Sequence, residues 1–177
     1  AAHELGVDLP TMAEAIDTAA PAFGRFERIP VPGPNCEQGT ITLLLVKNPT
    51  GLNEVVRTLV ASGVDLTATL FALNDGIADG RDTSWVWDAD VEPLLERAGA
   101  MVVTGTRSAE FGLRAIYGGL DPAGVILEPD LEQAMYRVLE RAREFTEHGH
   151  AYALVTYTAM LDMRAAIAAQ GWTRSYW

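Results

Sequence analysis

Short apolar segments alternate with amphipathic segments along most of the chain after residue 40. Each apolar segment ends close to Gly, Asn, Asp or another polar residue, as buried strands do. The intervening segments carry apolar residues three and four positions apart, which predicts helices with one buried face. The expected strands are 40–46, 68–73, 84–87, 101–104, 124–127 and 152–155, and the expected helices are 52–62, 91–98, 108–117, 130–146 and 159–169.

This alternation defines the fold class that we expect. Strands separated by helices of these lengths predict right-handed βαβ units, because parallel neighbours need a long crossover connection. Strands that are apolar throughout indicate a sheet covered on both faces. The prediction is therefore an α/β fold: a Rossmann-like, mostly parallel sheet with helices on both faces.

Residues 1–35 differ from this regular pattern. Residues 11–19 form a short amphipathic segment with Thr11 as a candidate N-cap, and residues 23–31 alternate loosely, as a strand would. The prolines and glycine that follow predict a stiff connector, at Pro30, Pro32, Gly33 and Pro34. We place a domain boundary there, which divides the chain into residues 1–35 and 36–177. The chain begins at Ala1 without Met, so we expect it to be part of a longer protein.

Composition excludes several classes of partner. The net charge is −11, which disfavours a nucleic-acid surface and attraction to an anionic membrane. Cys36 is the single cysteine, so the chain holds no internal disulfide, and no C-x-x-C pair predicts a zinc site. No apolar run reaches the length of about 18 residues that a membrane span needs. We expect a cytoplasmic protein without direct membrane insertion.

Polar clusters follow the carboxyl ends of the predicted strands. The clusters are 47–53, 74–82, 104–107, 128–130 and 156–158. In a parallel sheet these ends share one edge, where ligands of open α/β sheets bind. The run from Leu70 to Asp90 is the richest of them, since it combines Asn74, Asp75, Asp79, Arg81 and Asp82 with a glycine loop.

Two of these clusters precede predicted helices. Lys47 to Asn53 (KNPTGLN) places a cation, an amide and a glycine turn before a helix N-terminus, a pattern suited to an anion or phosphate. Its spacing differs from a Walker A loop. Thr104 to Ser108 (TGTRS) offers hydroxyls and one guanidinium, with Ser108 and Glu110 as a partial capping arrangement. The alternative for both clusters is an ordinary capped turn with a solvated cation.

Other polar residues leave alternatives open. Asp79 and Asp82 suit a metal, the orientation of a histidine, or a structural turn. We expect Asp88 and Asp90 to cap the next helix. His148 and His150 have no third ligand at useful spacing, which favours a solvated turn over a metal site.

The aromatic pair next to this loop suggests contact with something apolar. Trp85 and Trp87 alternate with Val86, so as a strand both would face one side. That side fits core packing or an aromatic interface.

Four motifs in order resemble the C-terminal domain of MurT, the Mur-ligase-like subunit of lipid II isoglutaminyl synthase. They read LVKNPTGLNEVVRTL, ALNDGIADGRDTSWVWDADVE, VVTGTRSAEFGLR and VTYTAML, and cover roughly residues 40–164. The most specific is D-G-R-D-T-S-W, residues 79–85. The earlier AFGRFERI resembles the end of the Mur ligase central domain, so residues 1–35 would be a remnant of that domain with a proline-rich linker.

The resemblance implies an enzyme that works as a complex. The full protein would amidate the α-carboxyl of D-glutamate in the lipid II stem peptide, using ATP, Mg²⁺ and ammonia from a GatD-type glutaminase subunit. GatD carries a Cys and a His but lacks the acid of its triad. The matching acid here is Asp82, which would orient the partner's histidine in trans. The main ATP site lies outside residues 1–177, so the piece alone is expected to be inactive.

The resemblance also implies residues for nucleotide, substrate and partner binding. Lys47, Asn48 and Asn53 would face the nucleotide or acceptor carboxylate, and Gly24 and Arg25 would contact nucleotide at the hinge. The muramyl-peptide side is assigned to Asn74, Asp75, Thr106 and Arg107. The partner interface is assigned to Arg81, Trp85 and Trp87, and no metal site is assigned to this domain.

By the same resemblance, the full enzyme would act on lipid II from the inner face of the membrane.

Two alternatives belong to other classes of function. In the first, the domain only docks the glutaminase and closes over substrate, and Asp82 is structural. In the second, it is a stand-alone nucleotide-binding domain, which the missing P-loop disfavours.

Overall fold

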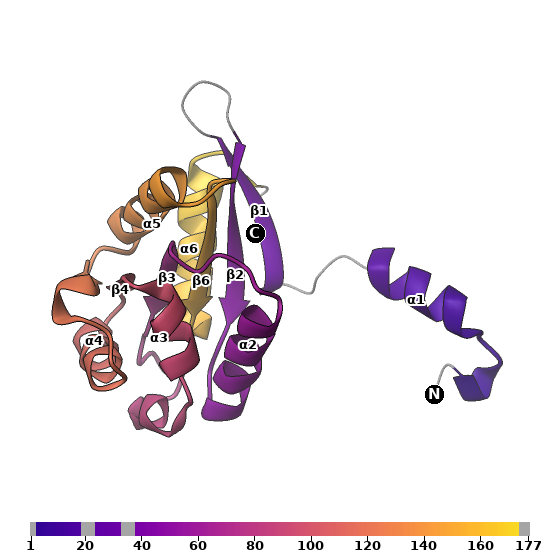
Figure 1. Cartoon of the computed structure of the whole chain (residues 1–177), viewed down its shortest axis with the longest axis horizontal. Coiled ribbons are helices and arrows are strands. Elements are labelled where there is room, and N and C mark those ends of the chain that lie inside the picture. Colours follow the sequence, from indigo (N-terminus) through magenta and orange to yellow (C-terminus); the bar gives the residue numbers. More distant parts are fainter. Residues whose placement is uncertain (1–2, 19–23, 33–37, 174–177) are drawn as a thin grey trace.

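The computed structural model describes residues 3–18, 24–32 and 38–173. Within them, one six-stranded sheet runs in the order β1-β2-β6-β3-β4-β5 (Figure 1). All pairs are parallel except β1 with β2. The strands are β1 (Arg25–Pro32), β2 (Gln38–Leu45), β3 (Thr69–Ala72), β4 (Met101–Thr104), β5 (Val125–Leu127) and β6 (His150–Val155). The predicted mostly parallel α/β sheet is confirmed.

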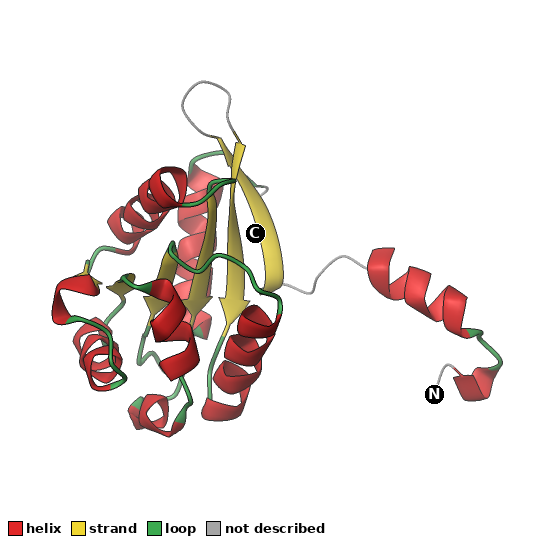
Figure 2. Cartoon of the chain, in the orientation of Figure 1, coloured by secondary structure: helices red, strands yellow, loops and turns green. Residues whose placement is uncertain are grey.

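Helices cover both faces of this sheet (Figure 2). One face carries α2 (Pro49–Ala61), α3 (Glu92–Ala98) and α4 (Ser108–Tyr117), and the other carries α5 (Leu131–Phe145) and α6 (Tyr157–Ala169). Short 3₁₀ helices are η1 (His3–Leu5), η3 (Ser84–Asp88) and η4 (Pro122–Gly124). Helix α1 (Leu9–Thr18) stands apart from the sheet (Figure 1). Among the described residues, no helix combines the length and the apolar character that crossing a membrane requires.

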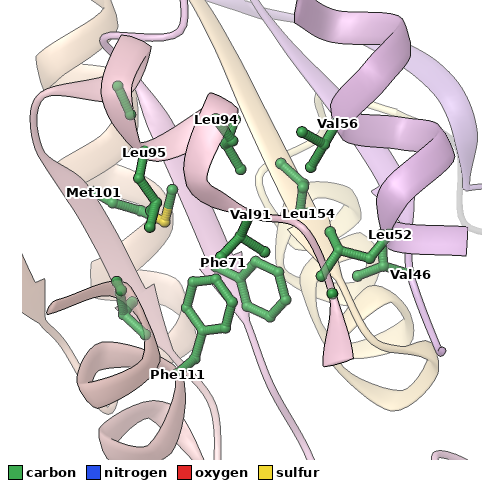
Figure 3. Close-up of a cluster of buried hydrophobic side chains, with 14 of the residues drawn as sticks. Val46, Leu52, Val56, Phe71, Val91, Leu94, Leu95, Met101, Phe111 and Leu154 are labelled. Carbon is green, nitrogen blue, oxygen red and sulfur yellow. The ribbon is translucent and has the colours of Figure 1, made fainter. Parts of the chain in front are cut away.

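Burial follows from the uniform apolar character of the central strands. Every residue of β3 and β4 is buried, as expected for strands packed on both faces. Phe71 of β3 and Phe111 of α4 stack with ring centroids 3.5 Å apart, and both are fully buried (Figure 3). This pair joins the sheet to the helix beside the Asp82 loop.

The proline-rich segment differs from its prediction. Pro30 and Pro32 lie inside β1, where they pair with Thr40 and Gln38, so these two prolines are part of a strand and not of a connector. An edge strand tolerates proline, because one row of its N–H groups needs no ladder partner. Gly33 and Pro34 lie outside the described residues.

Strand β1 belongs to the same sheet as the rest. Its Ile29 and Val31 are buried with β2, α5 and α6 in one apolar cluster. Glu27 pairs with the buried Arg164 of α6. The division at residue 35 therefore stays a proposal about the origin of the segment, while β1 packs with the sheet.

Two local predictions are corrected. Helix α1 starts at Leu9, and the carboxylate of Asp8 accepts the Thr11 amide at 2.8 Å, so Asp8 caps it instead of Thr11. Residues 84–88 form the 3₁₀ helix η3 and not a strand. Local hydrogen bonds override the strand tendency of these side chains, because the Ser84 amide donates to the Asp82 carboxylate and the Val86 amide donates to the Thr83 carbonyl. Strands β3 and β4 pair directly and leave no place between them.

Phe111→Ala tests the core on the α4 side. We expect the free energy of unfolding to fall by about 3–5 kcal/mol, because a fully buried ring is lost and a cavity remains. Urea unfolding followed by circular dichroism measures it. Phe145→Ala is the control: this ring is half-exposed on α5 and should cost less than about 1 kcal/mol. Equal losses would contradict the packing described here.

Candidate functional site

The loops after β3, β4 and β6 are hydrogen-bonded to one another. Asn74, which follows β3, is at the centre. Its amide N–H donates to Thr156 Oγ1 at 3.0 Å, its Nδ2 donates to Thr158 Oγ1 at 3.0 Å, and its Oδ1 accepts the Thr106 amide at 3.0 Å. Because β3 lies between β6 and β4, its loop reaches both neighbours. The predicted convergence of these three clusters is confirmed.

The turn after β4 wraps around the end of β3. Thr106 Oγ1 accepts the Asp75 amide and donates to Asp75 Oδ1 at 2.8 Å, while the Arg107 amide donates to the Leu73 carbonyl at 2.9 Å. Gly105 has φ +95°, and a Cβ there would lie 2.5 Å from the Leu73 carbonyl oxygen. Glycine is required at this close approach.

Asp79 fixes the middle of the loop. Its carboxylate accepts the Thr158 amide at 2.8 Å and also the Thr158 hydroxyl. Thr156, the N-cap residue of α6, makes no side-chain capping bond, so Asp79 satisfies the helix start from 79 positions away. Of the alternatives open for Asp79, these contacts support the structural one.

Asp82 itself is exposed and ionised. Its Oδ1 accepts the Ser84 amide at 2.9 Å, and hydrogen bonds from Ser84 hold the pKa of the Asp82 carboxyl below its usual range. The neighbouring Thr83 is buried, and its hydroxyl donates to Glu110 Oε2 at 2.7 Å. The Asp82 carboxylate is therefore charged and exposed to solvent, and the backbone next to it is anchored by the bond between Thr83 and Glu110.

Glu110 contributes a contact that the sequence did not indicate. Its Oε2 also accepts from Arg107 Nε at 3.0 Å and Nη2 at 2.7 Å, and this pairing raises the pKa of Arg107. Glu110 therefore binds Arg107 and Thr83 and does not pair with Ser108 in a capping arrangement; Arg107 is the N-cap residue of α4 and makes no side-chain capping bond. The i,i+3 spacing of Arg107 and Glu110 is a sequence signal for their ion pair, whereas no local spacing predicts the contact between Glu110 and Thr83.

The tryptophans do not face one side, as a strand would have required. Val86 between them is buried, and Trp85 packs partly buried against the core. Trp87 is 43% exposed and lies edge-on to Tyr117 of α4 at 5.8 Å. The buried Arg114 fastens this segment to α4, since it donates to the carbonyls of Val86 and Ala89. Arg81 is exposed beside Asp82.

Asn53 and Asp90 meet away from Lys47. The Asp90 amide donates to Asn53 Oδ1 at 2.8 Å, and Asn53 Nδ2 reaches the Asp90 carboxylate at 3.5 Å. Helix α3 starts after Val91, without a side-chain capping bond, so the predicted capping by Asp88 and Asp90 is wrong. The structure brings Asn53 to the α2–α3 contact.

Arg25, Lys47 and Asn48 line one pocket of about 380 Å³. It lies between the bulge of β1 and the N-terminus of α2, where the Asn48 side chain caps the helix by accepting the Gly51 amide at 2.7 Å. Phe26, at the bulge, has φ +54°, a left-handed conformation that is costly for a bulky residue. Strained backbone of this kind tends to occur at functional sites.

The histidines lie at the opposite edge of the sheet, where β6 begins. His148 is exposed, as a solvated turn predicts, but His150 is half-buried in β6, and its Nε2 lies 2.7 Å from Thr42 Oγ1. Burial lowers the pKa of His150. In the described part of the chain, no three His, Cys, Asp or Glu side chains are grouped to hold a metal ion.

Comparisons with known proteins show which proteins this chain resembles in sequence and in fold. Two relatives are MurT subunits of lipid II isoglutaminyl synthase (glutamine-hydrolyzing). The one from Streptococcus pneumoniae is 31% identical over 96% of this chain, and the one from Staphylococcus aureus strain COL is 30% identical over 91%. The chain spans only 36% and 34% of their lengths.

Solved structures share the fold. Mycobacterium tuberculosis folylpolyglutamate synthase, complexed with ADP and AMPPCP, matches with TM-score 0.51 at 19% identity, covering 96% of this chain and 36% of that one. UDP-N-acetylmuramate-alanine ligase MurC from Thermotoga maritima matches with TM-score 0.55 at 13% identity, covering 96% and 35%. The sequence model of the family described as MurT ligase C-terminal matches residues 45–160. The chain therefore belongs to the MurT ligase C-terminal family.

Proposed function

We propose that this chain is the C-terminal part of the MurT-type subunit of a lipid II isoglutaminyl synthase. The complete enzyme would amidate the α-carboxyl of D-glutamate in the stem peptide, using ATP and glutamine-derived ammonia, from the cytoplasmic side of the membrane. This domain docks a GatD-type glutaminase and supplies Asp82 to the partner's active site. Membership of the family and the names of the two MurT relatives support this assignment.

One observation carries the role of Asp82: a charged, exposed carboxylate stands on an anchored loop, and neither histidine of residues 38–173 lies beside it. His148 and His150 lie at the amino end of β6, whereas Asp82 follows the carboxyl end of β3. A carboxylate beside a catalytic histidine accepts its Nδ1 proton, fixes its tautomer and stabilises the imidazolium. Hydrogen bonds from Ser84 lower the pKa of Asp82 and so favour the charged form that this role needs. The histidine would come from the partner.

Exposed apolar side chains on η3 and α4, the elements joined to the Asp82 loop, support docking on this side of the domain. Leu113, Ile116 and Tyr117 lie three and four positions apart on α4, and Trp87 packs against Tyr117. Tyr117 is 76% exposed. We name these four residues the α4 strip. Because η3 begins two residues after Asp82 and is fastened to α4, a partner that covers Asp82 would also meet the α4 strip.

The pocket of Arg25, Lys47 and Asn48 fits a nucleotide phosphate. Arg25, Lys47 and the N-terminus of α2 line it, an arrangement that anions bind. Glu54 also lines the pocket, and its carboxylate is paired with Arg57. ATP, when bound in the complete enzyme, supplies the phosphoryl group that activates the acceptor carboxylate. Arg25 and Lys47 would contribute charge there. Asn53 has less support, because its amide is used by Asp90. We assign Mg²⁺ to ligands outside this domain.

Of the four residues assigned to the muramyl-peptide substrate, one is a strong candidate for binding it. Asn74, Asp75 and Thr106 bond mainly to one another, so their role would be to shape the edge. Arg107 is about half-exposed while still paired with Glu110, so it is the residue that we assign to an anionic group of the muramyl peptide.

The alternative is a docking and substrate-closure module in which Asp82 is structural. Its support is that the Asp82 carboxylate accepts the Ser84 amide at the start of η3, as a turn-forming Asp does. The two functions differ in what the charge of Asp82 does.

Asp82→Asn in the full-length complex separates them. The Asn oxygen still accepts the Ser84 amide, but the charge that stabilises the partner's imidazolium is gone. We expect the kcat for glutamine hydrolysis to fall at least about 100-fold while the Kd between the subunits stays unchanged. Asp88→Asn, an exposed acid at the end of η3, is the control. Full hydrolysis by the Asp82 variant would reduce this domain to docking and closure.

Tyr117→Ser tests the docking surface independently. The side chain is mostly exposed, so the fold should tolerate the change, while loss of an interface tyrosine weakens binding by about 1–2 kcal/mol, or roughly tenfold in Kd. Calorimetric titration of the full-length protein with the glutaminase measures this. Phe145→Ser, half-exposed on the opposite face of the sheet, should leave the Kd unchanged. Equal Kd values for both variants would place docking elsewhere.

A further inference from the structure

We infer that Thr83 and Glu110 are positioning residues that hold Asp82 in the geometry the partner's histidine requires. The inference rests on the proposed function of Asp82 and adds residues that act through it. Neither residue would touch glutamine or the partner's nucleophile. Their effect would come entirely through the backbone that carries the Asp82 carboxylate.

The Asp82 carboxylate is fixed by one turn. Its Oδ1 accepts the Ser84 amide, so the orientation of the carboxylate depends on the backbone between residues 82 and 84. Thr83 is the central residue of that turn. Whatever holds Thr83 therefore holds the direction in which the exposed carboxylate points.

Thr83 is held from below by a charged acceptor. It is 3% exposed, although the residues on either side of it are exposed, and its hydroxyl donates to Glu110 Oε2 at 2.7 Å. Hydrogen bonds to a carboxylate are stronger than those between neutral groups. The Glu110 side chain is restrained from changing rotamer, because Nε and Nη2 of Arg107 both donate to the same Oε2 atom.

The other end of the loop is held separately. Asp79 binds the start of α6 through Thr158, so the stretch around Asp82 is pinned at residues 79 and 83. Between them lies Gly80 at φ +86°, a residue with little conformational preference of its own. Without the Thr83–Glu110 bond, the nearest side-chain anchors of Asp82 would be Asp79, beyond a glycine, and the Arg114 contact with the Val86 carbonyl, four residues further on.

A small displacement of Asp82 would be costly. Proton-transfer partners work at hydrogen-bond distance, and a shift of about 1 Å in a catalytic group lowers rates up to about a hundredfold. A residue that supports such a group need not contribute to partner affinity. This separates positioning from docking in an experiment.

The test compares Thr83→Val with Thr83→Ser in the full-length complex. Valine has the shape of threonine without the hydroxyl, and serine keeps the hydroxyl. For Thr83→Val we expect the kcat of glutamine hydrolysis to fall about ten- to a hundredfold, with the KM for glutamine and the subunit Kd unchanged. Thr83→Ser should restore most of the rate. A Thr83→Val variant with wild-type kcat, or one that loses partner affinity instead, overturns the inference.

A second readout does not depend on activity. In NMR titration of the Asp82 carboxyl carbon, Thr83→Val should raise the pKa toward the ordinary value, because the Ser84 bond loosens, whereas Thr83→Ser should leave it low. An unchanged pKa in Thr83→Val contradicts the anchor even if Asp82→Asn abolishes hydrolysis. Conversely, an active Asp82→Asn enzyme refutes the proposed function while a raised pKa would still confirm the anchor.

Discussion

Parallel pairing of β3 between β6 and β4 is the constraint on which the candidate site depends. Paired backbones bring three carboxyl ends to one edge, so each following loop starts beside the other two. The loop after β3 then bonds to both neighbours, through Asn74 to Thr106 and Thr158 and through Asp79 to α6. Polar side chains in this edge serve mainly to hold one another, which leaves few of them free for ligands.

Against that background, Asp82 differs from the other acids of its loop. Asp75 and Asp79 are both bonded to side chains of neighbouring loops, whereas Asp82 bonds only locally to Ser84, within the described contacts, and faces solvent. An enzyme subunit that lends an acid to another chain needs this combination of a rigid loop and an open carboxylate. Under the proposed function, the exposed apolar α4 strip would supply the binding affinity, since exposed carboxylates contribute little to it.

The sequence predicts the regular elements well and the irregular contacts poorly. Strand 101–104 and helix 108–117 match their predictions, because a continuous apolar run marks the buried strand and apolar residues three and four positions apart mark the helix. Residues 84–88 fail because the aromatic and branched side chains favour a strand while local bonds to Asp82 and Thr83 form a 3₁₀ turn. The Thr83–Glu110 and Asn53–Asp90 contacts join residues 27 and 37 positions apart, which no local pattern encodes. The proposed role of Asp82 comes from the family resemblance and not from its spacing in the sequence.

The most direct test is the structure of the full-length complex with its glutaminase. The account predicts an Asp82 carboxylate oxygen within about 2.6–3.2 Å of Nδ1 of the partner's catalytic histidine. It also predicts that the partner covers Trp87 and Tyr117 and that Thr83 remains bonded to Glu110. A complex in which Asp82 faces solvent, or in which the partner's histidine is oriented by an acid of its own chain, would contradict the central claim.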